Sequence, residues 1–202
     1  MVAETVTTRS IEENDIPNIA RIHKAAYPPD HFTSRFSVKM LESMYFELWK
    51  VCKYSYVAVN NSGDVMGMIL GDNGRKIIEA KNNFYKKNIL AMTLASLRNP
   101  EFIKEIIVKK VFYKKNKNQS KALIRLVSIA VAPEYQRSNV GKVLMKVFEK
   151  ALIADNIYLY GTSAKASNTK VINFDKYHGM QEEYRDETGI YFIKELSSPT
   201  SS

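Results

Sequence analysis

The stretch Val131–Met145, VAPEYQRSNVGKVLM, joins an apolar run to an amphipathic one through a short polar loop. The apolar run from Leu123 to Val131 is the most continuous in the chain and predicts a central strand buried on both faces. It stops at Pro133, and apolar residues recur at helical spacing from Val140. The first N–H groups of a helix have no partner within it and carry partial positive charge, so the loop predicts an anion site.

The residues of this loop suit a pyrophosphate. Gly141 lets a ligand approach the backbone, and Ser138 or Asn139 can cap the helix or accept an unusual turn conformation. Arg137 and Lys142 add positive charge. Neither of the two common nucleotide motifs is present, because the Walker loop needs a glycine where this chain has glutamine and the dinucleotide fingerprint needs three glycines. Taken alone, the loop is equally compatible with an ordinary capped helix.

The rest of the chain predicts one domain over residues 1–196 and a disordered tail over residues 197–202. Strands are expected at Val6–Ile11, Tyr54–Val59, Val65–Leu70 and Ile157–Tyr160, with a final hairpin over Glu182–Leu196. Helices are expected after an Asp15 cap, after a Ser37 cap, from Asn83 to about Phe112 with a break at Asn99–Pro100, and over Thr169–Tyr177. We find no internal repeat and no interdomain linker.

Composition limits the partners and the compartment. Lys and Arg number 30 against 21 Asp and Glu, a formal charge of +9, which favours phosphate-bearing molecules or anionic surfaces. The basic residues are scattered and lack a stacking pattern, so we expect no nucleic-acid partner. The single cysteine, Cys52, lies on an apolar helical stripe and predicts a buried thiol, with no internal disulfide and no cysteine-based metal site. Without an apolar leader or a membrane-spanning run, we expect a cytoplasmic protein.

The run from Leu126 to Met145, followed by a strand, Asn168, a short helix and YHGM at 177–180, resembles the GNAT superfamily of acyl-CoA-dependent N-acetyltransferases. The superfamily signature has Gln or Arg, two residues, Gly, one residue, then Gly or Ala. Gln136, Asn139 and Gly141 occupy these places, so asparagine replaces the first glycine. Asparagine is the residue other than glycine that best tolerates a positive φ, and we therefore expect the loop to keep its shape.

The resemblance implies an α/β (α+β) GNAT fold, a mixed central sheet of about six to seven strands flanked by helices, with a helical insertion between the third and fourth strands. It covers the order of elements over nearly the whole chain, with motif matches between about Ile124 and Met180. It further implies that acetyl-CoA is the co-substrate, that no metal is used, and that Asn168 meets the pantetheine arm. Backbone groups of Ile129 and Val131 would bind the pantetheine amides, and the loop residues Gln136, Arg137, Ser138, Asn139, Val140, Gly141 and Lys142 would wrap the pyrophosphate.

The catalytic groups stay open at the level of sequence. An alkyl ammonium has a pKa near ~10.4, so a base or a desolvating pocket must remove its proton before it attacks a thioester. The oxyanion needs an N–H donor, which backbone near Ile129 could supply. His31, Glu79, Glu134 and His178 are available as bases, but the sequence gives none of them a geometry.

Family members often place a tyrosine acid seven residues beyond the asparagine that matches Asn168, and here that position holds Asp175. Tyr177 lies two residues further, on about the opposite helical face. Three hypotheses follow: Asp175 is a plain surface residue and no acid is needed, which we favour; Tyr177 reaches the sulfur; or Asp175 is buried and protonated.

The acceptor would be framed by the first two helices and the insertion between Leu70 and Lys121. That insertion and the segment PPDHFTSRFSVKMLESMY at 28–45 resemble GNAT enzymes found with surface-glycan biosynthesis, which acylate amino sugars. The basic amphipathic piece Glu101–Lys117 is expected to pack on the sheet, and it also fits a nucleotide-sugar or membrane-lipid acceptor.

The expected function is therefore transfer of acetyl from acetyl-CoA to a primary amine of a small molecule, by direct attack in a ternary complex. Two alternatives stay open: a non-catalytic acyl-CoA sensor or scaffold of this fold, and an acetyltransferase acting on protein or peptide amines. A dimer is compatible with the sequence. Gly141→Asp is expected to abolish CoA binding and leave the fold intact.

Overall fold

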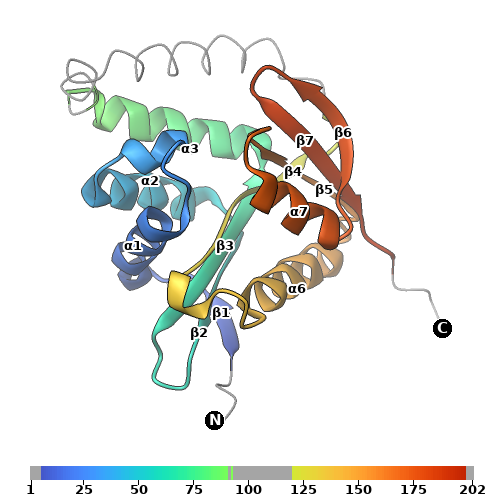
Figure 1. Cartoon of the computed structure of the whole chain (residues 1–202), viewed down its shortest axis with the longest axis horizontal. Coiled ribbons are helices and arrows are strands. Elements are labelled where there is room, and N and C mark those ends of the chain that lie inside the picture. The colour runs from blue at the N-terminus through green and yellow to red at the C-terminus, as the bar shows by residue number, and fades with distance from the viewer. Residues whose placement is uncertain (1–5, 91, 93–119, 199–202) are drawn as a thin grey trace.

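The computed structural model describes residues 6–90, 92 and 120–198, which form a mixed sheet with helices on both faces, as Figure 1 shows. The seven strands are β1 (Thr7–Ser10), β2 (Tyr54–Val59), β3 (Val65–Asn73), β4 (Ile124–Val131), β5 (Leu159–Ala164), β6 (Gln181–Asp186) and β7 (Gly189–Glu195). Their order in the sheet is β1-β2-β3-β4-β5-β7-β6. All neighbours pair antiparallel except β4 and β5, which are parallel. The predicted mixed sheet is confirmed.

The described helices form a layer on each face of this sheet. They are α1 (Ile16–Ala26), α2 (Val38–Val51), α3 (Gly74–Lys87), α6 (Val140–Ala154) and α7 (Thr169–Tyr177), with short 3-10 turns at Glu13–Asp15, Phe32–Arg35 and Pro133–Tyr135. Helices α1, α2 and α3 cover one face, and α6 and α7 pack on the other (Figure 1). No helix within the described residues has the length and apolar character needed to cross a membrane.

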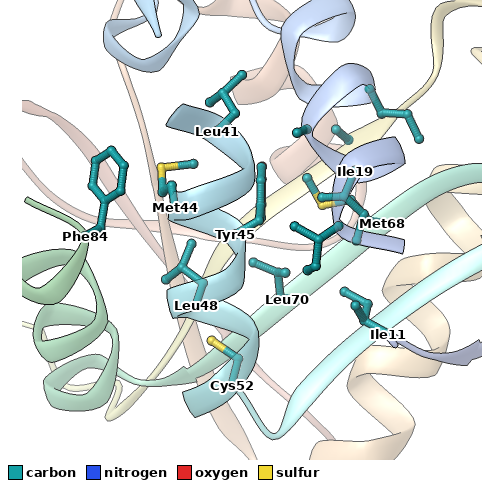
Figure 2. Close-up of a cluster of buried hydrophobic side chains, with 14 of the residues drawn as sticks. Ile11, Ile19, Leu41, Met44, Tyr45, Leu48, Cys52, Met68, Leu70 and Phe84 are labelled. Carbon is teal, nitrogen blue, oxygen red and sulfur yellow. The ribbon is translucent and has the colours of Figure 1, made fainter. Parts of the chain in front are cut away.

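The α2-side core lies between the first helical layer and the sheet. Figure 2 shows Ile19 of α1, Tyr45 of α2 and Met68 of β3 packed together, and all three are fully buried. Cys52 at the end of α2 is also buried, which confirms the predicted buried thiol. Phe84 brings α3 into the same cluster. Burial of these side chains, at roughly 25 cal/mol per Å² of apolar surface, is the main favourable term that holds α1, α2 and α3 on the sheet.

The α6-side core fills the opposite face. Its centre is Phe148 of α6, which is fully buried and meets the rings of Tyr54 on β2 and Tyr160 on β5 edge to face, at 6.1 and 5.5 Å between centroids. Apolar residues of β4, β5, β7 and α7 complete this cluster. The predicted apolar stripe of α6, from Val140 to Leu152, is thereby confirmed.

Two helix starts show how well local capping could be predicted. Ser37 caps α2 by accepting a hydrogen bond from the Met40 N–H at 3.2 Å, as predicted. The side chain of Asp15 does not cap α1. It instead accepts from both Nη atoms of Arg9, at 2.6 and 2.8 Å, and from the Glu12 N–H at 2.9 Å. The charged partner on β1 outcompetes the helix terminus for this carboxylate.

The helix after β3 begins at Gly74, earlier than the predicted Asn83. Asn73 ends β3 and caps α3 by accepting from the Arg75 N–H at 2.9 Å. The start was missed because the buried stripe of this helix is narrow; it consists of Ile77, Ala80 and Phe84. The predicted break at 99–100 and the basic piece at 101–117 lie outside the described residues, as does the tail from 199 onward.

Strand β5 runs over Leu159–Ala164, so the predicted strand at Ile157–Tyr160 was placed too early. The reason is the end of α6. Asn156 adopts a positive φ of 58°, and the Ile157 N–H donates to the Leu152 carbonyl at 2.9 Å. Ile157, which was expected in the strand, therefore forms part of the C-terminal cap of α6, and the strand begins after it.

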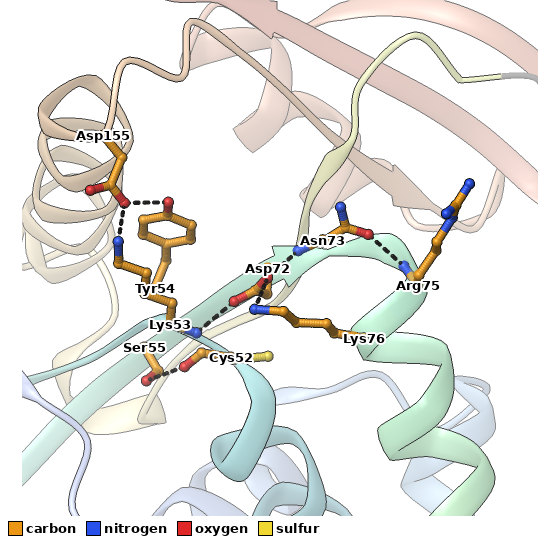
Figure 3. A network of polar contacts seen from close by, with 9 residues as sticks. All are labelled: Cys52, Lys53, Tyr54, Ser55, Asp72, Asn73, Arg75, Lys76 and Asp155. Atoms are coloured by element: carbon orange, nitrogen blue, oxygen red, sulfur yellow. Dashed lines mark hydrogen bonds and ion pairs between the residues drawn. The ribbon is translucent and has the colours of Figure 1, made fainter.

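A polar network joins the ends of β2, β3 and α6 (Figure 3). Asp72, which is buried on β3, accepts from the Lys53 N–H at 2.7 Å and pairs with Lys76 at 3.2 Å. Asp155 at the end of α6 accepts from the Tyr54 hydroxyl at 2.5 Å and pairs with the Lys53 ammonium at 2.6 Å. The network ties the start of β2 to the ends of β3 and α6.

We expect Phe148→Ala to lower the free energy of unfolding by about 3–5 kcal/mol, because the cavity would lie between two other buried rings. Tyr177→Ala serves as the control. Its side chain is 77% exposed, so its removal should change stability by less than about 0.5 kcal/mol. Urea unfolding measures both, and equal midpoints for the two variants would contradict the assigned core.

Candidate active site

Strands β4 and β5 separate soon after they meet. Within the described residues their parallel pairing begins at Ile124 and ends at Arg125, whereas the pairing of β4 with β3 continues to Val131. One further contact follows, from the Thr162 Oγ1 to the Leu126 carbonyl at 3.3 Å. The β5-facing edge of the second half of β4 is therefore open, and a ligand carrying amide groups can pair with it as a strand would.

The direction of the peptide groups along this edge follows from their alternation. The Ala132 N–H donates to the Met66 carbonyl of β3 at 2.9 Å. Because peptide groups point to alternate edges of a strand, those of Ile129 and Val131 point away from β3 and toward the opening. The side-chain amide of Gln136 donates to the Val131 carbonyl at 3.3 Å and closes the end of the edge. Ile129 and Val131 thus lie on the open edge of β4, and their binding of the pantetheine amides stays a prediction.

A β-bulge in β4 determines which of its side chains point to each face of the sheet. Leu126 and Ser128 pair with consecutive residues of β3, so Val127 has no residue opposite it. Leu126 packs in the α6-side core, and so do Ile129 and Val131 after the bulge, while Ser128 faces α1 and α2. Buried residues lie on both faces of β4, with Ile124 and Leu126 in the α6-side core and Ala130 in the α2-side core, which confirms the predicted burial on both faces. The extra residue, Val127, reverses the alternation of side chains along β4, so that the Ser128 hydroxyl faces α1 and α2.

The loop between β4 and α6 has the backbone expected of an anion site. Asn139, the N-cap of α6, adopts a left-handed conformation with a φ of 69°, and Arg137 does so with a φ of 68°. The prediction that asparagine accepts the turn of the replaced glycine is confirmed. Left-handed Asn139 followed by helical Val140 turns successive N–H groups toward one concave surface, and the first-turn N–H groups of Gly141 and Lys142 extend it.

Side chains brace this loop and leave its charges exposed. The Ser138 hydroxyl donates to the Tyr135 carbonyl at 2.5 Å, so it holds the loop and does not cap α6. Arg137 and Lys142 are exposed. A Cβ on Gly141 would lie 3.1 Å from the ring of Phe174 on α7, so the start of α6 and α7 pack closely here. Gly141→Asp would require the Phe174 ring to shift by a few tenths of an ångström, and the expectation that this variant keeps the fold stays a prediction.

A pocket of about 400 Å³ lies between the α1–α2 connection and the start of α7. Its walls are Ala26, Tyr27, Pro28, Pro29, Asp30, Ser167, Asn168, Thr169 and Lys170. The two sides are linked, because Lys165 donates to the Asp30 carbonyl at 2.7 Å and Ser167 Oγ donates to the Asp30 carboxylate at 3.3 Å. Asn168 lines this pocket, and its side chain caps α7 by accepting from the Val171 N–H at 3.2 Å.

Behind the pocket, a row of polar side chains runs between α1, α2 and β4. Tyr27, which lines the pocket, shares a hydrogen bond with Ser128 at 2.8 Å, and Ser128 shares another with Tyr45 at 2.9 Å. Tyr45 contacts the Nδ1 of His23 at 2.6 Å. His23 is 2% exposed, and burial is the main cause that lowers its pKa to about 3.

The two acid candidates on α7 lie in different environments. Asp175 is 2% exposed, so the favoured prediction of a plain surface residue was wrong. Among the described atoms its Oδ2 has no hydrogen-bond partner, and burial raises the pKa of the carboxyl to about 7. Tyr177 projects from the exposed face of α7. A carboxyl in this environment can hold a proton near neutral pH.

The structure separates the base candidates. His31 is half-buried, and its Nδ1 contacts the Thr33 hydroxyl at 2.8 Å beside the pocket. Glu79 and Glu134 are exposed. The Nδ1 of His178 contacts the Phe174 carbonyl at 2.8 Å, which ties this ring to α7. Among residues 6–90, 92 and 120–198, no group of three His, Cys, Asp or Glu side chains is arranged to hold a metal ion.

Sequence reasoning missed Tyr27, Tyr45 and Ser128. One signal for them was available: a serine inside the most apolar strand must find a hydrogen-bond partner, since an unpaired buried hydroxyl costs about 1–3 kcal/mol. The partners themselves are 101 and 83 residues away in the chain, so no local pattern identifies them.

Asp175 makes stability depend on pH in a defined direction. The folded state holds the proton more tightly than the unfolded chain, so the contribution of this group is present below its unfolded pKa of about 4 and is lost as pH rises to about 7. We expect the wild type to lose stability between pH 4 and 8 relative to Asp175→Asn, which stays neutral throughout. Chemical unfolding at several pH values measures the difference, and parallel curves for the two proteins would show that Asp175 is ionised in the fold.

Comparison with known proteins agrees with this geometry. The profile of the acetyltransferase (GNAT) family matches residues 16–180. No curated protein sequence matched significantly. Similar solved structures include SsHAT, with 15% identity over 96% of this chain and 100% of that chain, at a TM-score of 0.69.

Two further structures share the fold. Arylalkylamine N-acetyltransferase 2 from Aedes aegypti is 15% identical over 96% of this chain and 100% of that chain, at a TM-score of 0.64. The PaiA N-acetyltransferase from Thermoplasma acidophilum, solved in complex with coenzyme A, is 14% identical over 95% of this chain and 99% of that chain, at a TM-score of 0.58. The family profile spans most of the chain, from the start of α1 to the end of α7 and beyond, and the protein belongs to the GNAT acetyltransferase family.

Proposed function

We propose that the protein transfers an acetyl group from acetyl-CoA to a primary amine of a small molecule, by direct attack in a ternary complex. One observation carries the proposal: β4 leaves β5 after Arg125, and its open edge leads into the left-handed loop before α6. The same strand adjoins the pocket that Asn168 lines, because Ser128 contacts Tyr27 of the pocket wall. The loop end suits a pyrophosphate and the strand edge suits the two amides of pantetheine. The pocket end leaves room for the amine.

The residues present fit these tasks. Left-handed Asn139 and small Gly141 keep side chains out of the concave backbone surface, and Arg137 and Lys142 add charge at its rim. Peptide groups of Ile129 and Val131 offer hydrogen bonds along the edge, and the Ile129 N–H is the candidate donor to the developing oxyanion. The site can bind a thioester while most of its hydrogen bonds come from main chain.

We assign the proton donor to the leaving thiolate to Asp175. Burial raises the pKa of the carboxyl to about 7, so part of it holds a proton at neutral pH, and it occupies the helical position where family members often carry a tyrosine acid. Tyr177 is the weaker choice because its side chain points to solvent. A neutral carboxylic acid can donate a proton at neutral pH as a phenol does.

The acceptor class is the finer part of the proposal. The pocket wall combines prolines and a tyrosine with one carboxylate, Asp30, which already pairs with Lys165. No unpaired acidic cluster lines it among the described residues, so a polycation is a poor fit and a compact amine, such as an amino sugar, is a better one.

We expect saturable acetyl-CoA binding by calorimetry that depends on the backbone of the loop. Asn139→Gly restores the family signature and should bind as tightly as the wild type or more tightly. Asn139→Val places a branched side chain at a positive φ, at roughly 1–2 kcal/mol, and should weaken binding about tenfold. Identical affinities in all three proteins would show that the pyrophosphate binds elsewhere.

Activity is tested by thiol release from acetyl-CoA with a nucleotide-linked amino sugar, glucosamine, phenethylamine, spermidine and an alanine peptide. We expect turnover with an amino sugar, and a lower kcat in Asp175→Asn than in Tyr177→Phe. Turnover with the peptide alone would favour the protein-acetylating alternative. Tight acetyl-CoA binding without turnover of any amine would favour the sensor or scaffold.

A further inference from the structure

The polar side chains behind the pocket form one hydrogen-bonded row of six. In order they are Tyr27, Ser128, Tyr45, His23, Thr33 and His31, with successive contacts of 2.8, 2.9, 2.6, 2.7 and 2.8 Å. His23 uses both ring nitrogens, Nδ1 toward Tyr45 and Nε2 toward Thr33. The row draws its members from α1, the α1–α2 connection, α2 and β4.

Each interior member of the row carries one exchangeable proton and one acceptor site along it. Hydroxyl groups and a neutral imidazole both donate and accept, whereas an ammonium, a guanidinium or a carboxylate acts in one direction. All the hydrogen bonds can therefore point from Tyr27 to His31, or all can point back. Changing from one arrangement to the other moves one proton from end to end.

The ends of the row lie where a proton would enter and leave. Tyr27 lines the pocket, and its partner Ser128 immediately precedes Ile129 on the open edge of β4. His31 is half-buried at the other end, next to Asp30 and its partner Lys165. His23 and Tyr27 also stack at 3.8 Å between ring centroids, which holds both rings in place.

We propose that this row is a proton relay that carries the proton released by the acceptor amine from Tyr27 to His31; the proposal rests on the acetyl transfer proposed above. The amine nitrogen gives its proton to the Tyr27 oxygen as it forms its bond to the acyl carbon. The Tyr27 proton passes to Ser128, the Ser128 proton to Tyr45, and the Tyr45 proton to Nδ1 of His23. The Nε2 proton of His23 passes to Thr33, and the Thr33 proton to Nδ1 of His31, which releases one proton to water.

The neutrality of His23 is what keeps the relay continuous. An imidazolium would donate from both nitrogens and would block transfer through the ring. Burial, together with the nearby charges of His31 and Lys24, lowers the pKa of His23 to about 3. Burial likewise raises the pKa values of Tyr27 and Tyr45, so both tyrosines hold their protons at rest. These interior groups thus transmit a proton and do not store one.

The relay predicts a coupling that a merely structural network lacks. When His31 is protonated, its Nδ1 must donate to Thr33, Thr33 must donate to Nε2 of His23, and His23 must carry its own proton on Nδ1. When Nδ1 of His31 accepts, the tautomer of His23 is reversed. The position of the His23 proton should therefore follow the charge of His31, although His23 itself stays neutral.

Nitrogen-15 NMR of the histidine side chains tests this coupling in the free protein, without a substrate. We expect the tautomer of His23 to switch when His31 gains its second ring proton, which the same spectra report as pH is lowered. Thr33→Val should abolish the switch and Thr33→Ser should retain it, because serine keeps the hydroxyl. A single His23 tautomer across the wild-type titration would overturn the relay.

Turnover is measured on the same variants with acetyl-CoA and glucosamine or whichever panel amine reacts. We expect kcat to fall at least ~10-fold in Thr33→Val and less than about threefold in Thr33→Ser, with the affinity for acetyl-CoA unchanged in both. Equal kcat in both variants and the wild type would overturn the relay and leave the acetyl transfer standing. A wild type inactive with every amine would overturn the acetyl transfer itself.

Discussion

The separation of β4 from β5 is the constraint on which the candidate site depends. A strand inside a sheet normally has both edges paired, because buried peptide groups without partners are costly. Here β4 pairs with β3 from Ile124 to Val131, whereas its ladder pairing with β5 ends at Arg125. The Arg125 guanidinium stands at the point of divergence, where it donates to the Thr162 carbonyl at 2.6 Å and to the Ser120 hydroxyl at 3.0 Å. The rest of the site is arranged around the peptide groups that this divergence leaves open.

Two helical layers then give the opening two chemically different sides. On the α6 side lie the left-handed loop, exposed cations and the first turn of a helix, which together suit phosphate oxygens. On the α2 side lie neutral hydroxyls and imidazoles that are buried and mutually hydrogen-bonded. The loop that suits an anion and the row proposed to carry a proton therefore lie on opposite faces of one sheet.

The sequence predicted the parts of this arrangement that are local. The loop, its left-handed asparagine and the helix after it follow from residue types within a few positions, and so does the Ser37 cap. The parts that were missed depend on tertiary partners. Asp15 was drawn to Arg9, the end of α6 took residues expected in β5, and Asp175 was buried by packing that helical spacing alone does not specify. The hydrogen-bonded row joins residues more than 80 positions apart, which no single-sequence pattern encodes.

The bulge at Val127 arises because β4 has one residue more than the part of β3 that it pairs with, whatever the identity of that residue. Substitutions along β4 change one side chain at a time and leave each face composed of the same positions. Removal of Val127 would take out the unpaired residue and keep Leu126 and Ser128 on their present faces, because these two already pair with consecutive residues of β3. A residue added after Ser128 would instead move Ile129 and every residue beyond it to the opposite face, out of the α6-side core. The bulge can therefore be lost without an exchange of faces, whereas a change of length after it would separate the two sides of the site in a single step.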